Sequence, residues 1–216
     1  VFTFICKLNK IPTIELQHGT VGRYHINYNF RNNKNLKLKT FPDLFLSWGS
    51  YWTKNSRLPL NDKNLILTGF PYLNHYKKKY VQRQKGKSKK ILFLSQLRMD
   101  IANFANFSAK LLPEYKVLFK THPAETSFAE GKYLKIFNSK NVILINDEKK
   151  DLYSLFLECE IVCGVSSTAL IEATEFCNKI AILKLPGWEY FEDLNPTKKV
   201  KFINNSQELV DFCNED

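Results

Sequence analysis

From residue 90 onward, short apolar runs alternate with segments of helical length, and this alternation restricts the possible folds more than any other feature. The apolar runs are KKILFLSQ, YKVLFKTHP, NVILIND, IVCGVSS and KIAILKLPG, at residues 89–96, 115–123, 141–147, 161–167 and 179–187. Helix-like stretches lie at 99–114, 124–140, 149–160 and 168–178, and a short strand and a helix follow at 201–205 and 206–216. Nearly continuous apolar strands separated by helices indicate a parallel sheet covered on both faces. We therefore expect a doubly wound α/β domain over residues 91–216.

The first 76 residues predict part of another domain of the same class. Strand-like runs occur in PTIELQHG, DLFLSWGSYW and NLILTGFP, at residues 12–19, 43–52 and 64–71, with helix signals between them. The sequence starts at Val1 without Met and in strand-like residues, so we expect an N-terminal portion of this domain to be missing. The expected fold class is α/β, with two Rossmann-like doubly wound parallel-sheet domains, the N-terminal one incomplete.

Charge is distributed unevenly along the chain. Residues 1–90 carry 18 basic and 3 acidic residues, a net charge of +15, whereas residues 91–216 carry 14 and 18, a net charge of −4. The stretch KKKYVQRQKGKSKK, residues 77–90, has eight basic residues and no acidic one. We interpret it as a solvated linker between the domains. The alternative is a patch for an anionic membrane or polymer, where each Lys contributes about 1 kcal/mol; without a recognisable nucleic-acid-binding module, nucleic acid is not expected.

Several functional classes are disfavoured by composition and by the motifs that are lacking. The chain has 216 residues, 44% of them hydrophobic, which is enough for a sizeable core, and no apolar run approaches the length of a membrane span. Five scattered cysteines without a C-x-x-C pair argue against a disulfide framework or a zinc site, and four histidines argue against a His-rich metal centre. Neither G-x-G-x-x-G nor a P-loop occurs, which disfavours dinucleotide redox chemistry and ATP hydrolysis. We expect a cytoplasmic protein without a signal peptide, a metal or a cofactor.

Polar residues follow four of the expected strands, in LQHGT, TGFPY, FKTHP and VSST (16–20, 68–72, 119–123 and 165–168). Ligands of open parallel sheets bind at the carboxyl ends of the strands, so these are the candidate site residues. His18 is a candidate general base because an imidazole with a pKa of about 6.5 accepts a proton at neutral pH; a histidine without a catalytic role is the alternative. Gly19, Thr20 and Gly69 are candidate substrate contacts beside it.

The two later strand ends carry groups suited to an anionic ligand. His122, followed by Pro123, is a candidate donor to a phosphate or nucleotide oxygen, with Lys120 nearby as a point charge. The alternative is a histidine that caps or packs against a loop.

The residues Ser166, Ser167 and Thr168 stand where an apolar strand turns into a helix. We expect them to cap this helix and also to present its amides to a donor phosphate. Glu172, one turn later, would hydrogen-bond a ribose, or else be an exposed helical glutamate. Trp188, which follows Pro186 and Gly187 in a loop, would stack on a base or sugar or else pack at the interdomain hinge.

These stretches resemble a known family. LQHGT is similar to the W-H-G-T stretch of the CDP-glycerol glycerophosphotransferases, the teichoic acid polymerases, in which that histidine is the proposed catalytic base. KTHP and VSST resemble the His-Pro and Ser-Ser/Thr motifs that these enzymes share with bacterial sialyl- and polysialyltransferases, where they contact the nucleotide and phosphate of the donor. ELQHGTVGRYH, FPDLFLSWGSYW, GFPY and ALIEATEFCNKIAILKLPGWEY look like capsule and surface-polysaccharide glycosyltransferases of the GT-B type. The resemblance covers nearly the whole chain.

The chain also departs from the family pattern. Gln17 stands where the teichoic acid enzymes have Trp, and Gly164 and Val165 replace their usual Asp-Tyr. The acidic motif of bacterial sialyltransferases is not evident. These departures leave the identity of the donor open.

The resemblance implies a metal-independent GT-B enzyme with an acceptor-side domain over 1–76 and a donor-binding domain over 91–216. It would transfer a sugar or glycerol phosphate from a CMP- or CDP-activated donor to a polysaccharide or lipid-linked acceptor, building a bacterial capsule or surface polysaccharide at the inner face of the plasma membrane. His18 would deprotonate the acceptor hydroxyl while groups of the donor domain stabilise the leaving phosphate. A UDP-sugar transferase or UDP-sugar 2-epimerase of the same fold is one alternative, and a noncatalytic polysaccharide- or membrane-binding subunit is another.

Overall fold

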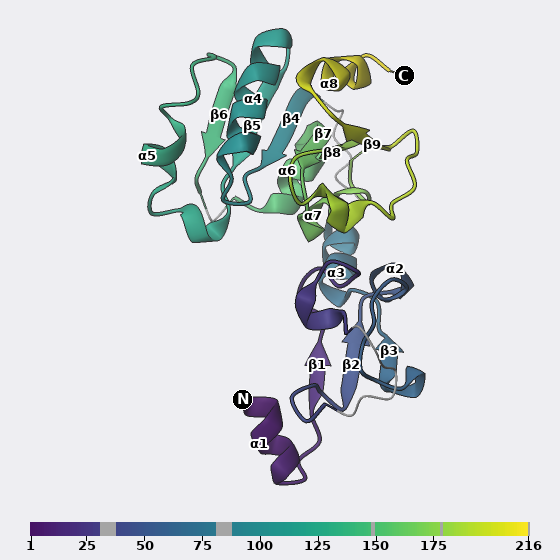
Figure 1. Cartoon of the computed structure of the whole chain (residues 1–216). Helices are drawn as coiled ribbons and strands as arrows, with labels where there is room; N and C mark the ends of the chain where they lie inside the picture. The colour runs from purple at the N-terminus through teal and green to yellow at the C-terminus, as the bar shows by residue number, and fades with distance from the viewer. Residues whose placement is uncertain (31–37, 81–87, 148–149, 178, 216) are drawn as a thin grey trace. The chain divides into compact units, whose positions relative to one another are not determined.

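A computed structural model of the chain describes residues 1–30, 38–80, 88–147, 150–177 and 179–215. The chain divides into two compact units, Val1–His75 and Tyr76–Asp216, here called unit 1 and unit 2. Each unit is built on its own parallel sheet (Figure 1). The boundary lies within helix α3 (Pro71–Tyr80), one residue before the predicted end of the first domain.

The predicted basic linker at 77–90 forms regular structure along its described part, which corrects that interpretation. Residues 77–80 complete α3 and residues 88–90 begin strand β4 (Ser88–Leu94), while residues 81–87 lie outside the described residues. Contacts within unit 2 hold this end of α3. The Tyr76 ring stacks on Tyr153 with a centroid distance of 4.4 Å, and Lys77 Nζ lies 2.6 Å from Glu175 Oε2.

Unit 1 contains the three predicted N-terminal strands, which form a parallel sheet in the order β1-β2-β3. Their bounds are Ile14–Leu16, Leu44–Ser47 and Leu65–Leu67, and the short helices of this unit are α1 (Phe2–Leu8), η1 (Ile26–Tyr28), α2 (Ser50–Thr53) and η2 (Asp62–Asn64). Helix α1 overturns the strand-like interpretation of the N-terminus. Its apolar residues also fit a helical period, and Lys7 Nζ pairs with Asp43 at 3.2 Å.

Unit 2 contains a six-stranded parallel sheet in the order β6-β5-β4-β7-β8-β9. After β4, the strands are β5 (Lys116–Lys120), β6 (Val142–Ile145), β7 (Cys159–Gly164), β8 (Lys179–Leu183) and β9 (Val200–Ile203). The chain proceeds from β4 outward to β6, returns to β7 on the other side of β4, and continues outward to β9. The strand order therefore reverses between β4 and β7, which is where open sheets of this class bind ligands.

Helices cover both faces of this sheet, as the apolar strands predicted. They are α4 (Met99–Leu111), η4 (Pro123–Glu125), α5 (Ala129–Tyr133), α6 (Leu152–Glu158), α7 (Thr168–Ala173), η5 (Trp188–Phe191) and α8 (Ser206–Cys213). Along β4 the neighbouring residues Leu92 and Phe93 point to opposite faces, and both are fully buried. The doubly wound architecture expected for this domain is confirmed.

The long helix predicted over 124–140 does not form. The short helices η4 and α5 occupy part of this range, and turns and loops fill the rest. One side chain in this range and one directly after it make tertiary hydrogen bonds. Glu125 turns into the interior, and Asn141 Nδ2 donates to the carbonyl oxygens of Ala109 and Tyr115, each at 2.9 Å.

In the described part of the chain, no helix has the length and apolar character needed to cross a bilayer. All five cysteines are buried, and burial raises the pKa of the Cys159 thiol to about 12. The described residues contain no cluster of three or more His, Cys, Asp or Glu side chains placed to hold a metal ion.

Candidate functional site

Three loops meet at the carboxyl edge of the unit 2 sheet, following β4, β5 and β7. Because β4 lies between β5 and β7, the loop after β4 contacts both neighbours. Ser95 Oγ accepts a hydrogen bond from the His122 amide at 2.8 Å, and Gln96 Nε2 donates to Ser166 Oγ at 3.1 Å. The structure therefore brings the predicted residues His122 and Ser166 to opposite sides of one loop that the sequence did not single out.

A buried carboxylate, Glu125, holds this edge of the sheet in place. Its two oxygens accept hydrogen bonds from five groups: the side chains of Ser95, Tyr133 and Lys132 and the backbone amides of His122 and Leu97. Burial by itself would raise the pKa of Glu125, but these hydrogen bonds outweigh it and lower the pKa to about 2. Glu125 is therefore ionised and positions the loops on either side of it.

Sequence reasoning missed Glu125, although a signal for it exists. In a capping box, a side chain caps a helix while a Glu three residues later bonds back to the cap residue. His122 and Glu125 form such a box around η4, with Pro123 as the first residue of the helix.

His122 is exposed, and its hydrogen bonding fixes its preferred tautomer. Nδ1 accepts from the Ala124 amide at 3.1 Å, so a neutral ring carries its proton on Nε2. The capping alternative is thus confirmed, and it leaves Nε2 able to donate to an anion. Lys120, at the end of β5, donates from Nζ to the Asp147 carbonyl oxygen at 3.1 Å.

The turn after β7 forms the predicted helix cap. Ser167 Oγ accepts from the Ala169 amide at 3.3 Å. The Ser166 amide, however, does not stand open to a ligand as expected, because it donates to Gln96 Oε1 at 3.2 Å. The Val165 amide donates to the same oxygen at 2.8 Å.

The Gln96 side chain therefore occupies the amides at the start of the β7 turn. Gln96 and Leu97 have φ angles of 49° and 60°, in the left-handed region that residues other than glycine seldom adopt. Such backbone geometry persists where the surrounding structure enforces it, often beside a ligand site. No motif in the sequence marks a glutamine after a strand, so local patterns could not have found this residue.

The loop after β8 closes on the same edge of the sheet. Arg98 Nη1 donates to the Pro186 carbonyl oxygen, and Arg98 Nε donates to Asp100 Oδ1 at 2.9 Å. Gly187 has a φ angle of 99°, and a Cβ added there would lie 3.4 Å from Arg98 Nη1 and 3.8 Å from Ser166 Oγ. The glycine therefore permits the left-handed turn, while an added Cβ would make only ordinary van der Waals contacts with the neighbouring loops.

The predicted substrate contact Trp188 and the predicted donor contact Glu172 both have partners inside unit 2. The Trp188 ring packs edge-on against Phe202 at 5.5 Å. Glu172 is half-buried, not exposed, and accepts a hydrogen bond from the Tyr153 hydroxyl. Burial raises the pKa of Glu172, partly offset by hydrogen bonds from Tyr153 and Thr168.

In unit 1, His18 follows β1 and is exposed. The buried Gln17 side chain fixes this turn: its Oε1 accepts from Ser47 Oγ and from the Trp48 amide, and its Nε2 donates to the Gly19 carbonyl oxygen, each at 2.9 Å. The residue that departs from the family pattern is thus the one that holds the His18 turn.

The other candidate contacts of unit 1 lie at or beside the same strand ends. Gly69 follows β3 with a φ angle of 73°, a conformation that glycine adopts readily. The next residue, Phe70, stacks its ring on Trp48 with a centroid distance of 4.1 Å. Thr20 is half-buried in the turn after His18.

No family model and no curated protein matches the sequence. Among solved structures, the chain is similar to the wall teichoic acid polymerase TagF, with a TM-score of 0.57 and 14% identity over 95% of this chain and 59% of TagF. A TagF variant soaked with CDPG gives a TM-score of 0.56 and 14% identity over 96% of this chain and 58% of that one. Staphylococcus aureus MnaA with UDP gives a TM-score of 0.64 and 14% identity over 99% of this chain and 62% of MnaA. The chain thus spans about 60% of the length of these proteins, and the likeness shows the GT-B-like α/β fold.

Proposed function

We propose that the chain is part of a transferase that takes a sugar or glycerol phosphate from a CMP- or CDP-activated donor and adds it to a bacterial capsule or surface polysaccharide. The observation that carries the proposal is the meeting of the loops after β4, β5 and β7 where the strand order of unit 2 reverses. The fold shared with TagF, which has been soaked with CDPG, supports a cytidine donor.

In this proposal, donor groups of unit 2 stabilise the charge that develops on the leaving phosphate, without a metal ion. His122 donates from Nε2, and Lys120 contributes positive charge. Gln96 Oε1 stands in for a phosphate oxygen at the amides of Val165 and Ser166, so donor binding displaces the Gln96 side chain. Glu172 lies one turn into α7 and contacts the ribose.

Calorimetric titration of the chain with CMP, CDP, UDP and GDP tests the donor site. We expect cytidine-selective binding that weakens about 10-fold or more in His122→Ala and in Ser167→Ala, since hydrogen bonds to charged groups contribute about 1.5–3 kcal/mol. Ser127→Ala is the matched control, because Ser127 is an exposed serine beyond the η4 turn. Equal binding by all variants would place the nucleotide elsewhere.

A uridine-linked donor is the second candidate. The observation that favours it is the likeness to MnaA with UDP, which has the higher TM-score of 0.64. Uridine-selective binding in the same titration would favour a UDP-sugar transferase or a UDP-sugar 2-epimerase. Binding of no nucleotide by a folded chain would favour a noncatalytic polysaccharide- or membrane-binding subunit.

His18 is proposed as the base that deprotonates the acceptor hydroxyl, with Gly19, Thr20, Gly69 and Trp188 as substrate contacts. Its exposure at the end of β1, in a turn clamped by Gln17, supports this role. Once transfer is measured, His18→Ala should lower the rate about 10²-fold or more, as is typical for loss of a general base. His75→Ala, at another exposed histidine, should retain the rate.

Peripheral contact with an anionic membrane through residues 77–90 remains part of the proposal. Within the described residues, some of this charge is compensated: Lys77 pairs with Glu175, and Lys90 Nζ lies 3.1 Å from Glu158 Oε2. Sedimentation with anionic and neutral liposomes tests the contact. Equal sedimentation with both would refute it.

A further inference from the structure

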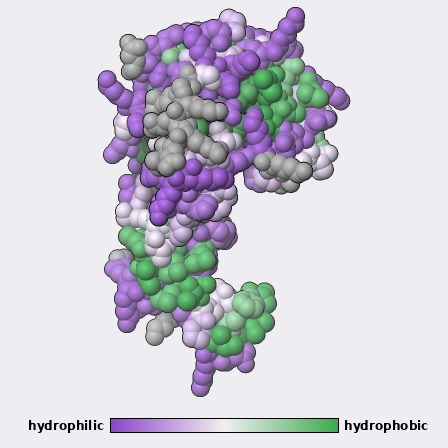
Figure 2. All heavy atoms as spheres, turned by 180° about the vertical axis from the view of Figure 1, so that it is seen from behind, coloured by the Kyte–Doolittle hydropathy of each residue, from purple (hydrophilic) through white to green (hydrophobic). Residues whose placement is uncertain are grey.

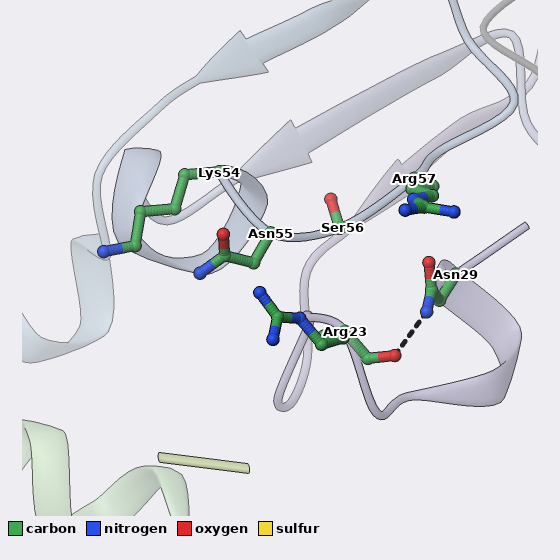
Figure 3. Close-up of a pocket in the computed structure, with 6 residues that line it drawn as sticks. All are labelled: Arg23, Asn29, Lys54, Asn55, Ser56 and Arg57. Atoms are coloured by element: carbon green, nitrogen blue, oxygen red, sulfur yellow. Dashed lines mark hydrogen bonds between the residues drawn. The ribbon is translucent and has the colours of Figure 1, made fainter. Parts of the chain in front are cut away.

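Unit 1 contains a hollow that is not part of the strand-end motifs. It has a volume of about 590 Å³. Figure 3 shows the residues that line it: Arg23, Asn29, Lys54, Asn55, Ser56 and Arg57. Its volume lies within the range of about 300–1,000 Å³ that is usual for small-molecule sites.

The lining of the hollow has the chemistry of an anion site. Of the six described residues that line it, three are cations and none is acidic. The guanidinium of Arg23 extends toward Asn55, while Arg57 lies beside Asn29 (Figure 3). Guanidinium groups match the geometry of phosphate oxygens and can donate two parallel hydrogen bonds.

The charge of unit 1 increases the attraction for anions. Residues 1–75 carry 10 basic and 3 acidic residues, a net charge of +7. Two of the three carboxylates are engaged elsewhere, because Glu15 accepts from the Tyr28 hydroxyl and Asp43 pairs with Lys7. A surplus of positive charge around a concave surface raises the local concentration of anions.

Backbone contacts hold the two segments that form the hollow. Asn29 and Arg57 form a parallel β-bridge, in which the Phe30 amide donates to the Arg57 carbonyl oxygen at 3.0 Å and the Arg57 amide donates to the Tyr28 carbonyl oxygen at 3.3 Å. Asn29 Nδ2 also donates to the Arg23 carbonyl oxygen. Because these hydrogen bonds already fix the two segments, a ligand can bind the cations with little loss of backbone conformational entropy.

We propose that this hollow binds a phosphate ester. Arg23 and Arg57 contact the phosphate, Lys54 adds positive charge, and the amide and hydroxyl groups of Asn29, Asn55 and Ser56 bind the hydroxylated part of the ester. The inference concerns unit 1 alone and stands independently of the nucleotide proposed for unit 2.

Calorimetric titration of the whole chain with glycerol 3-phosphate tests this inference, with glycerol as the uncharged control. We expect saturable binding of the ester only, weakened at least about 10-fold in the Arg23→Gln/Arg57→Gln double variant. Asn55→Asp, which places a carboxylate in the hollow at nearly constant volume, should also weaken it. The matched controls are Lys63→Gln and Asn61→Asp, at exposed residues of unit 1 outside the hollow.

Vesicles distinguish a soluble ester from a lipid headgroup. The chain could bind phosphatidylglycerol vesicles but neither phosphatidylcholine vesicles nor glycerol 3-phosphate. If the double variant also abolishes that binding, the hollow recognises a phosphate, and the phosphate belongs to a lipid headgroup. Thermal unfolding shows whether each variant is folded. Absence of binding to both probes, or equal binding by the folded double variant, overturns the inference.

Discussion

The sheets of the two units are both parallel, but they are buried to different degrees. In unit 2, Leu92 and Phe93 of β4 are each 0% exposed on opposite faces. In unit 1, Ile14 and Leu16 of β1 are 61% and 65% exposed, and Leu67 of β3 is 53% exposed. Helices cover both faces of the larger sheet, whereas apolar side chains of the smaller sheet and of α1 remain on the surface, coloured green in Figure 2.

This difference shows that an apolar strand pattern does not by itself produce a self-sufficient core. Parallel sheets are normally covered on both faces. The core of unit 1 rests largely on an aromatic cluster in which the Tyr28 ring lies 5.5 Å from Phe45 and 6.5 Å from Phe41. Unit 2 is therefore expected to supply most of the stability of this chain.

The largest expected effect comes from separating the units. Residues 71–216, which keep all of α3, should unfold cooperatively in denaturant because their sheet is covered on both faces. Residues 1–75 should show no cooperative transition and should bind the dye ANS through their exposed apolar side chains. Circular dichroism and fluorescence measure both properties. A cooperative transition in residues 1–75 would contradict the comparison.

Two leucines, one buried in β4 and one exposed in β1, test the difference in burial between single strands of the two sheets. Leu92→Ala should lower the free energy of unfolding by about 2–5 kcal/mol, because it leaves a cavity in a closely packed core. Leu16→Ala should change it by less than about 0.5 kcal/mol, because this side chain is largely in water. Urea titrations of the whole chain give both values. Similar costs at the two positions would mean that β1 is covered in solution.

The hydrogen bonds of Glu125 in unit 2 and of Gln17 in unit 1 should contribute different amounts to the free energy of unfolding. Glu125→Gln should cost about 3 kcal/mol at pH 7, because it removes a buried charge that pairs with Lys132 and accepts hydrogen bonds from four other groups. The amide of the variant would face groups that all donate hydrogen bonds. Gln17→Ala in unit 1 should cost about 1–3 kcal/mol, since it leaves neutral groups unpaired. Glu130→Gln, at an exposed glutamate, is the control and should be nearly neutral.

The pH dependence follows from the direction of the Glu125 shift. Its pKa is lower in the folded state than in the unfolded state, so its contribution is complete above about pH 4.5 and is lost as the pH falls toward 2. Glu125→Gln should flatten this part of the stability profile. If the stability of the variant falls between pH 4.5 and 2 as it does in the unmodified chain, other carboxylates control this pH dependence.

The smallest expected effect is at Glu172, whose pKa burial raises. The folded state therefore disfavours the ionised form, and this cost is present at neutral pH and disappears as the pH falls below the unfolded value. Glu172→Gln should modestly increase stability at pH 7 and make it less dependent on pH above the ordinary pKa of a glutamate. Thermal unfolding across this range tests it, and a destabilised variant would contradict the assignment.

Local patterns along the chain predict the strands of both sheets and the polar residues at their ends. Periodicity and β-propensity act over a few residues, so runs such as ILFL and IVCG predict buried strands, although the apolar run at the N-terminus forms helix α1. The order of strands and helices after residue 90 also restricted the topology to a doubly wound sheet. His122 and Ser167 could therefore be expected at one edge before their neighbours were known.

Which loops meet, and which side chains fill the space between them, depends on the tertiary fold. Glu125 turns inward within a predicted helix because five donors, on segments before and after it, converge on its carboxylate. Gln96 reaches the β7 turn because β7 lies beside β4, although about 70 residues separate them. The cationic hollow likewise depends on the bridge between Asn29 and Arg57. Contacts between residues distant in sequence depend on strand order and loop closure, which no local pattern of side chains encodes.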